Sequence, residues 1–153
     1  MNHKEEGFTL LETLFVLTIL SAFFLFPALS IDEVIESTQI DLFFRELTSK
    51  VTQMQTHAVL NGEMTEIEFV PELNTIRFYV RETDEEDHYL NAFWELDNPY
   101  YKLGGTHPQT FTFKRGTGNI TSSRKVHFDT TKGRYELVYY LGSGRFEIRE
   151  RQR

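Results

Sequence analysis

The chain of 153 residues has no cysteine, one tryptophan and four prolines. The lack of cysteine excludes disulfides, thiolate metal sites, iron–sulfur clusters, cysteine nucleophiles and a lipid-modified cysteine anchor. Hydrophobic residues make up 40% of the chain and charged residues 25%, which is typical of a globular protein and not of a disordered one. The length fits one domain, or one domain with an appendage.

Positive charge is scarce in most of the chain. The formal net charge is -7, which disfavours a generic nucleic-acid binder because neutralising phosphates requires clustered Lys and Arg. Residues 1–31 carry a net -2, and residues 32–110 carry sixteen acidic and five basic residues. Residues 111–153 reverse the pattern with ten basic and four acidic residues. The sequence therefore has an acidic middle and a basic end.

Residues 8–31 form a long apolar run with a single charge. About 20 apolar helical residues cross the core of a bilayer, so this run predicts a transmembrane helix. Lys4 precedes the run, and the next basic residue is Arg45. This bias favours an N-terminus on the cytoplasmic side.

Two features of this run leave alternatives open. Ala22, Ala28 and Ser30 offer a weak small-residue cleavage site, so a secretory signal peptide is one alternative. The charge is Glu12, and a carboxylate within a membrane helix usually has a partner and a function. Alternatively, Glu12 lies one turn inside the span, and its side chain extends to the membrane–water interface.

The start of the run resembles a known signal. An apolar run directly follows the residues Gly7, Phe8, Thr9, Leu10, Leu11 and Glu12. This order is similar to the class III signal of type IV pilins and pseudopilins. The resemblance implies a leader peptide of residues 1–7, cleavage by a prepilin peptidase between Gly7 and Phe8, and N-methylation of Phe8. It also implies that Glu12 pairs with the N-terminal amine of a neighbouring subunit during filament assembly. The leader departs from the family pattern, which tends to be more basic.

Residues 32–62 change from a continuous to a periodic apolar pattern. The apolar positions are spaced alternately by four and three residues, as on one face of an amphipathic helix; they are Ile40, Phe44, Leu47, Val51, Met54 and Ala58. Asn61-Gly62 supplies a stop signal. The pattern predicts one helix over residues 8–60, kinked near Phe23 by Pro27.

Residues 63–153 predict an antiparallel β domain. Thr65, Ile67 and Phe69 alternate with acidic residues, and Ile76, Phe78 and Val80 alternate with Arg77, Tyr79 and Arg81. The two runs predict a hairpin whose outer face places Glu66 and Glu68 near Arg77 and Arg81. Further strands are predicted over 110–114, 125–128, 134–141 and 145–149, with Asn98-Pro99 and Gly104-Gly105 in loops.

The predicted fold class is α+β and pilin-like, with a long N-terminal helix packed on an antiparallel sheet of about five to seven strands. The end of the chain adds a second resemblance. Phe111-Thr112-Phe113, a Gly-rich turn with Asn119, and residues 140–148 (YLGSGRFEI) are similar to the close of minor pseudopilins. Among these the resemblance favours the ComGD-like competence pseudopilins of Gram-positive bacteria. It covers about the first 30 and the last 45 residues.

No enzymatic signature is present. The five histidines have no spacing typical of a metal site. Residues 142–145 (GSGR) can be interpreted as a phosphate-binding loop, but no Lys-Ser/Thr and no helix follow, which favours a hairpin turn. The acidic run of residues 82–87 is typical of a solvated loop, with a cation site as the alternative. We therefore expect no catalytic residues, no metal and no cofactor.

The basic end suggests a contact surface. Basic residues interleaved with aromatic ones are typical of surfaces that follow a nucleic-acid backbone. The residues predicted to contact DNA or another subunit are Arg124, Lys125, Arg134, Arg145 and Arg149. A solvated sheet face that complements an acidic neighbour is the alternative.

The function implied by the resemblance is that of a structural subunit. It would be a minor pseudopilin of the competence machinery, needed to assemble a transformation pseudopilus that brings DNA through the cell wall. Its implied partners are other major and minor pseudopilins, the prepilin peptidase, and the assembly ATPase with its platform protein. The implied location is the cell membrane, single-pass, and then the cell surface. A DNA-binding module and a pseudopilin of type II secretion are alternatives; a secreted enzyme is disfavoured.

Overall fold

The computed structural model describes residues 9–28, 31–81, 88–121, 124–142 and 144–151. The chain divides into two compact units, Met1–Thr38 and Gln39–Arg153. Its elements in chain order are α1 (Leu10–Ala28), α2 (Ile31–Leu60), β1 (Thr65–Val70), the 3₁₀ helix η1 (Pro71–Leu73), β2 (Thr75–Val80), β3 (Ala92–Glu95), β4 (Tyr101–Gly104), β5 (Gln109–Phe113), β6 (Lys125–Thr130), β7 (Arg134–Tyr139) and β8 (Phe146–Glu150).

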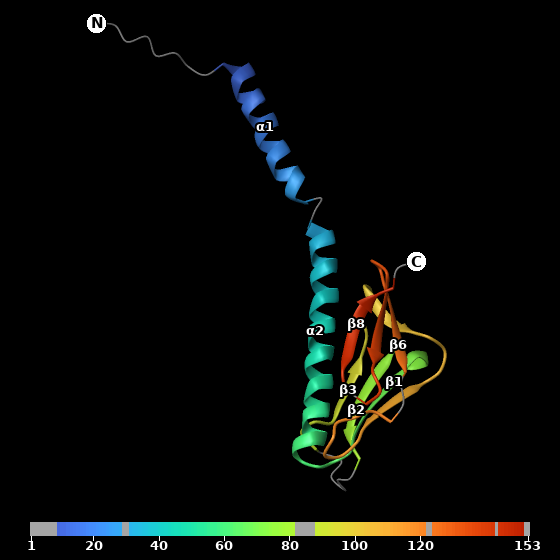
Figure 1. Cartoon of the computed structure of the whole chain (residues 1–153). Coiled ribbons are helices and arrows are strands. Elements are labelled where there is room, and N and C mark those ends of the chain that lie inside the picture. The colour runs from blue at the N-terminus through green and yellow to red at the C-terminus, as the bar shows by residue number, and fades with distance from the viewer. Residues whose placement is uncertain (1–8, 29–30, 82–87, 122–123, 143, 152–153) are drawn as a thin grey trace, which may run out of the picture. The chain divides into compact units, whose positions relative to one another are not determined.

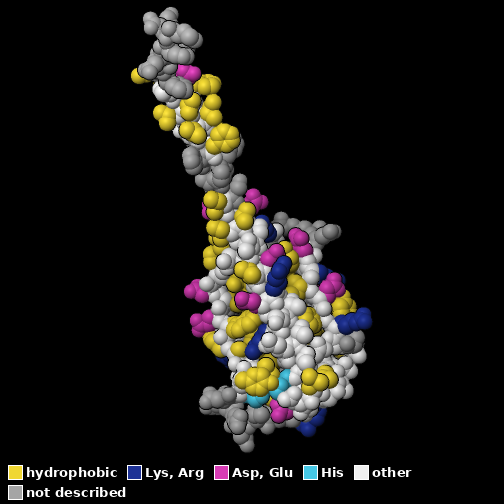
Figure 2. Space-filling view, turned by 90° about the vertical axis from the view of Figure 1, so that its left-hand side faces the viewer, with side chains coloured by type: hydrophobic (Ala, Val, Ile, Leu, Met, Phe, Trp, Pro, Cys, Tyr) yellow, Lys and Arg dark blue, Asp and Glu magenta, His cyan; other side chains and the backbone are white. Residues whose placement is uncertain are grey.

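Helix α1 carries the apolar run, and its side chains from Leu10 to Phe23 are exposed (Figure 2). Within the described residues, no helix combines the length and apolar character required to cross a membrane. The described parts of the predicted helix over residues 8–60 are helical as α1 and α2, but residues 29–30 between them lie outside the described residues, so the continuous helix stays a prediction. Proline lacks an amide donor and its ring clashes with the preceding turn. Consistent with this, α1 ends one residue after Pro27.

Helix α2 confirms the predicted amphipathic stripe. All six apolar positions of the stripe are buried, and Phe43 and His57 are buried beside them. Ile40, Leu47 and Met54 are at most 3% exposed. The three-and-four spacing therefore identified the face of α2 that packs into the core.

The described residues of the β domain form eight strands in two sheets, with orders β3-β2-β1-β5 and β4-β6-β7-β8. All strand pairs are antiparallel. The α+β class with antiparallel strands is confirmed, but the predicted single sheet of five to seven strands is wrong. A period of two identifies a strand and its two faces, but it does not determine which strand lies beside it.

The predicted hairpin is confirmed with its register. Strands β1 and β2 pair so that Glu68 lies opposite Arg77, and η1 forms the turn between them. Arg77 Nη1 lies 3.3 Å from Glu68 Oε2, and Arg81 Nη1 lies 2.9 Å from Glu66 Oε1. Burial and a hydrogen bond with Glu66 raise the pKa of Tyr79 well above its ordinary value.

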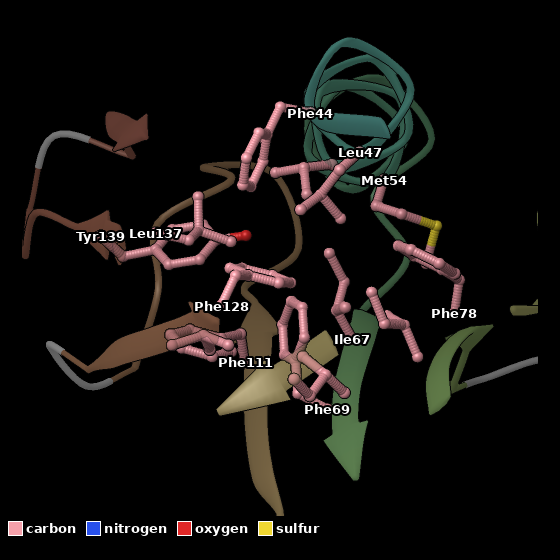
Figure 3. Close-up of a cluster of buried hydrophobic side chains, with 14 of the residues drawn as sticks. Phe44, Leu47, Met54, Ile67, Phe69, Phe78, Phe111, Phe128, Leu137 and Tyr139 are labelled. Atoms are coloured by element: carbon pink, nitrogen blue, oxygen red, sulfur yellow. The ribbon is translucent and has the colours of Figure 1, made fainter. Parts of the chain in front are cut away.

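One hydrophobic core joins α2 to both sheets within the Gln39–Arg153 unit (Figures 1 and 3). Phe128 of β6 lies at the junction. Its ring centroid is 5.5 Å from that of Phe43 and 5.6 Å from that of Phe44 on α2, and 6.2 Å from that of Phe69 on β1. Aromatic side chains, which are abundant in the sequence, therefore fill the space between α2, β6 and β1.

Strands β3 and β4 were not predicted, and each is only four residues long. Gly104 was assigned to a loop, but it ends β4 opposite His127 of β6. A Cβ atom at Gly104 would lie 3.1 Å from Asp129 Oδ2 and 3.2 Å from His127 Cβ. The glycine thus permits a close approach of two strands, which sequence alone does not distinguish from a turn.

Candidate functional site

The first turn of α1 holds the Glu12 predicted to act in assembly. Thr9 precedes the helix, and its Oγ1 and carbonyl oxygen accept hydrogen bonds from the backbone N–H of Glu12 at 3.3 and 3.0 Å. Thr9 is therefore the N-cap residue and Glu12 the third residue of the helix. A Thr followed three residues later by Glu forms a capping box, in which the Glu side chain can accept from the N-cap amide.

Glu12 thus has two chemical roles open to it. It can complete the cap of α1, and it lies near the positive end of the helix dipole. It is also exposed, so its carboxylate is available to a cation outside the chain. Gly7 and Phe8, the predicted cleavage and methylation positions, lie outside the described residues.

The predicted contact surface lies on the outer face of the second sheet. Residues of neighbouring strands are aligned across this face by the pairs His127–Glu136 and Glu136–Arg149. Lys125 is exposed at the start of β6, and Arg134 is exposed at the start of β7. Arg124 and Arg145 are exposed next to these strands. The structure therefore brings Lys125, Arg134 and Arg149 onto one sheet.

A buried carboxylate lies at the centre of this face. The side chain of Glu136 is 7% exposed. Its Oε2 is 3.5 Å from Arg149 Nη2 and 3.8 Å from Lys125 Nζ, and its Oε1 is 3.5 Å from His127 Nδ1 and 3.7 Å from Arg151 Nε. Glu136 therefore neutralises part of the basic charge that the sequence assigned to an external partner.

Sequence analysis did not identify Glu136, although a signal was present. It is the only acidic residue in the run from 134 to 146 and is flanked by apolar and aromatic residues. Arg134 is similarly engaged, since its Nε donates to Asp129 Oδ1 at 2.7 Å. The surface is thus a mixed-charge face with a basic excess and not an uninterrupted basic patch.

Two glycine-containing turns contact α2 through one side chain. Gln55 Nε2 donates to the carbonyl oxygens of Gly144 at 2.6 Å and of Gly118 at 3.2 Å. Strands β7 and β8 pair on either side of residues 142–145, which confirms the hairpin-turn interpretation. A phosphate-binding loop presents amide N–H groups to its ligand, whereas here the Gly144 carbonyl is directed at the helix; Ser143 lies outside the described residues.

Three residues form a cluster that the sequence spacing did not reveal. His57, Glu63 and His88 place one donor atom each within 4.8 Å of one another. They come from the last turn of α2, the segment before β1 and the segment before β3. The fold brings these three residues together from separate segments, so a search for a short metal-binding motif in the sequence does not identify them.

The chain is 25% identical over 142 residues to competence protein ComGD of Streptococcus pneumoniae strain R6. The match covers 93% of this chain and 78% of that protein. The ComGD-like resemblance is therefore confirmed, as a distant one. No protein-family model and no solved structure matches the chain.

Proposed function

We propose that the chain is a minor pseudopilin of a competence machinery, a structural subunit that helps to assemble a pseudopilus and to bring external DNA through the cell wall. The observation that carries the proposal is the similarity to ComGD over 93% of the chain. The α+β fold, with an apolar helix ahead of an antiparallel β domain, is compatible with a pilin-like subunit. The role is structural and not enzymatic.

In this proposal the apolar residues 8–31 anchor the chain in the cell membrane as a single span and later enter the core of the filament. The prepilin peptidase cleaves between Gly7 and Phe8, and the new N-terminus is methylated. The carboxylate of Glu12 then pairs with the Phe8 ammonium of a neighbouring subunit. The exposed apolar side chains of α1 support this, because exposed apolar surface of this extent marks an interaction site.

The partners in the proposal are other competence pseudopilins, the prepilin peptidase, and the assembly ATPase with its platform protein. At the cell surface the β domain faces outward. No cofactor or metal is required for this function.

Deletion of the gene in its own host tests the proposal. We expect loss of transformation with normal growth and normal protein secretion, and recovery of transformation by the wild-type gene. Loss of protein secretion with normal transformation would instead identify a pseudopilin of type II secretion. Normal transformation in the deletion strain would contradict the competence role.

Direct DNA contact is a second candidate function, favoured by the basic excess on the outer face of the second sheet. Lys125, Arg149 and Arg151 lie on this face with side chains 51%, 44% and 55% exposed. Glu136 forms ion pairs with these three groups and reduces the net charge of the face. DNA binding through this face would therefore be weak and sensitive to salt.

For this candidate, Glu136→Gln is expected to strengthen DNA binding several-fold, because it frees the surrounding cations while nearly keeping the side-chain shape. The measurement is DNA affinity of the intact chain against salt. Each additional phosphate contact makes the fall of log K with log salt steeper by about 0.9. Glu95→Gln on β3 of the other sheet is the matched control and should change nothing. An unchanged affinity in Glu136→Gln would show that the face does not contact DNA.

A further inference from the structure

We propose that His57, Glu63 and His88 form a binding site for a divalent transition-metal ion, with Zn²⁺ as the ion their donor atoms fit best. The three residues supply two imidazole nitrogens and one carboxylate oxygen within 4.8 Å of one another. Two His and one Glu is a ligand set that zinc uses with water in the fourth position. Hard cations such as Mg²⁺ prefer an all-oxygen set.

The bond between His57 and Glu63 marks where the ion sits. His57 Nε2 and Glu63 Oε2 are 2.7 Å apart, which is a hydrogen-bond distance that requires a proton on one of the two atoms. Ligands about 2.05 Å from zinc in a tetrahedral arrangement are roughly 3.3 Å apart. Replacing the proton by the ion therefore needs the two side chains to separate by only about 0.6 Å.

Tyr89 provides a partner for the other nitrogen of His57. Its hydroxyl oxygen lies 3.2 Å from His57 Nδ1. When Nε2 binds the ion, the remaining proton of the ring lies on Nδ1 and is donated to the Tyr89 oxygen. A tyrosine hydroxyl can both donate and accept, so the contact survives the change of tautomer. Metal-binding histidines almost always have such a partner.

His88 completes the set at some cost. Its Nδ1 accepts a hydrogen bond from the Leu90 amide at 3.2 Å, and its ring centroid lies 5.1 Å from that of His57. Binding the ion breaks this long bond, because the Nδ1 lone pair must either coordinate or be protonated. We therefore expect affinity in the micromolar range rather than the tighter binding of a fully preformed site.

The site is reachable from solvent. His57 is buried at 5% exposure, but the Glu63 side chain is 32% exposed. A surface hollow of about 630 Å³ along α2 is lined by His57, Leu60, Tyr89 and Leu90 among others. Histidine side chains reach the surface beside a hydrophobic side chain in Figure 2. A bound ion would tie the end of α2 to the segments before β1 and β3, and so stabilise the fold.

Titration calorimetry of the intact chain in detergent, carrying a tag without histidine, tests the proposal. We expect one Zn²⁺ per chain, no response to Mg²⁺, and a visible absorption spectrum of four-coordinate Co²⁺ when cobalt replaces zinc. Glu63→Gln and His88→Ala should each weaken Zn²⁺ binding at least about tenfold.

His107→Ala is the control, because His107 is exposed and outside the cluster. It removes one histidine but should leave binding unchanged. Far-UV circular dichroism shows whether each variant is folded. The substitutions are placed at Glu63 and His88, which are partly exposed, because removing the buried His57 side chain would leave a cavity in the core. Zn²⁺ binding that is absent, or that survives both cluster variants, would overturn the site.

Discussion

Replacing Gly144 by alanine is expected to lower the free energy of unfolding by about 3 kcal/mol, whereas Gly142→Ala should lower it by only about 1–2 kcal/mol. Both glycines lie in the β7–β8 turn with positive φ, +62° and +79°. A left-handed backbone conformation costs an L-residue about 1–2 kcal/mol, so both variants lose this amount of stability.

The difference between the two variants comes from α2. A Cβ atom at Gly144 would fall on Gln55 Nε2 and lie 3.2 Å from the Gly118 carbonyl oxygen, whereas at Gly142 nothing lies within 4 Å. The Gln55 amide would have to move and lose its bonds to both carbonyls. Each lost bond of this kind costs about 1 kcal/mol.

Urea unfolding of the intact chain, followed by circular dichroism and by the fluorescence of Trp94, gives both values. In a Gln55→Ala background Gly144→Ala should cost less than in the wild type, because the side chain that blocks the methyl group is gone; the 3.2 Å approach to the Gly118 carbonyl oxygen remains as the difference from Gly142→Ala. Equal penalties for the two glycines in the wild-type background would show that the turn does not depend on α2.

Replacing Glu12 by valine or by glutamine is expected to reduce transformation at least about a hundredfold, because in the proposed filament it breaks a buried ion pair between subunits, which costs about 3–5 kcal/mol. Glutamine tests the charge separately from the helix cap. It can still accept from the N-cap amide in a capping box, but it cannot neutralise an ammonium.

Thr9→Ala provides the complementary variant. It removes the Oγ1 bond to the Glu12 amide and keeps the carboxylate. Losing an N-cap costs about 1 kcal/mol, so we expect a fall of less than about tenfold. If Glu12→Gln transforms as well as wild type while Thr9→Ala and Glu12→Val fail, then Glu12 serves the helix cap and not a neighbouring subunit. Immunoblots of the membrane fraction control for protein amount.

The sequence predicted those parts of the fold that periodicity determines. The spacing of Leu47, Val51 and Met54 identified the buried face of α2, and the alternation around Glu66 and Arg81 gave a hairpin with its ion pair. Both depend on residues close in sequence, where a side chain's direction follows from the helix or strand period.

What escaped prediction depends on contacts between distant segments. Gln55 meets Gly144 across 89 positions, and His57 approaches His88 across 31. The division into two sheets has the same origin, because β1 pairs with β2 and also with the distant β5. Glu136 shows the consequence for a functional prediction. Basic residues of the C-terminal third were predicted to contact DNA or another subunit, whereas the fold places the Glu136 carboxylate beside Arg149 and Arg151.

The functional prediction came from the resemblance to pseudopilins, because neither the periodicity of the sequence nor the fold indicates a function. The order from Gly7 to Glu12 predicted a pilin-type signal, and the end of the chain predicted a ComGD-like protein, which the distant match confirms. Cleavage, methylation and the role of Glu12 remain predictions.

The intact mass of the mature protein, isolated from its own host and fragmented from the N-terminus, tests the pseudopilin proposal most directly. The account predicts a chain that begins at Phe8 and carries one methyl group on its amine. A chain that keeps Met1, or one cleaved near Ala28 as by a signal peptidase, would contradict it.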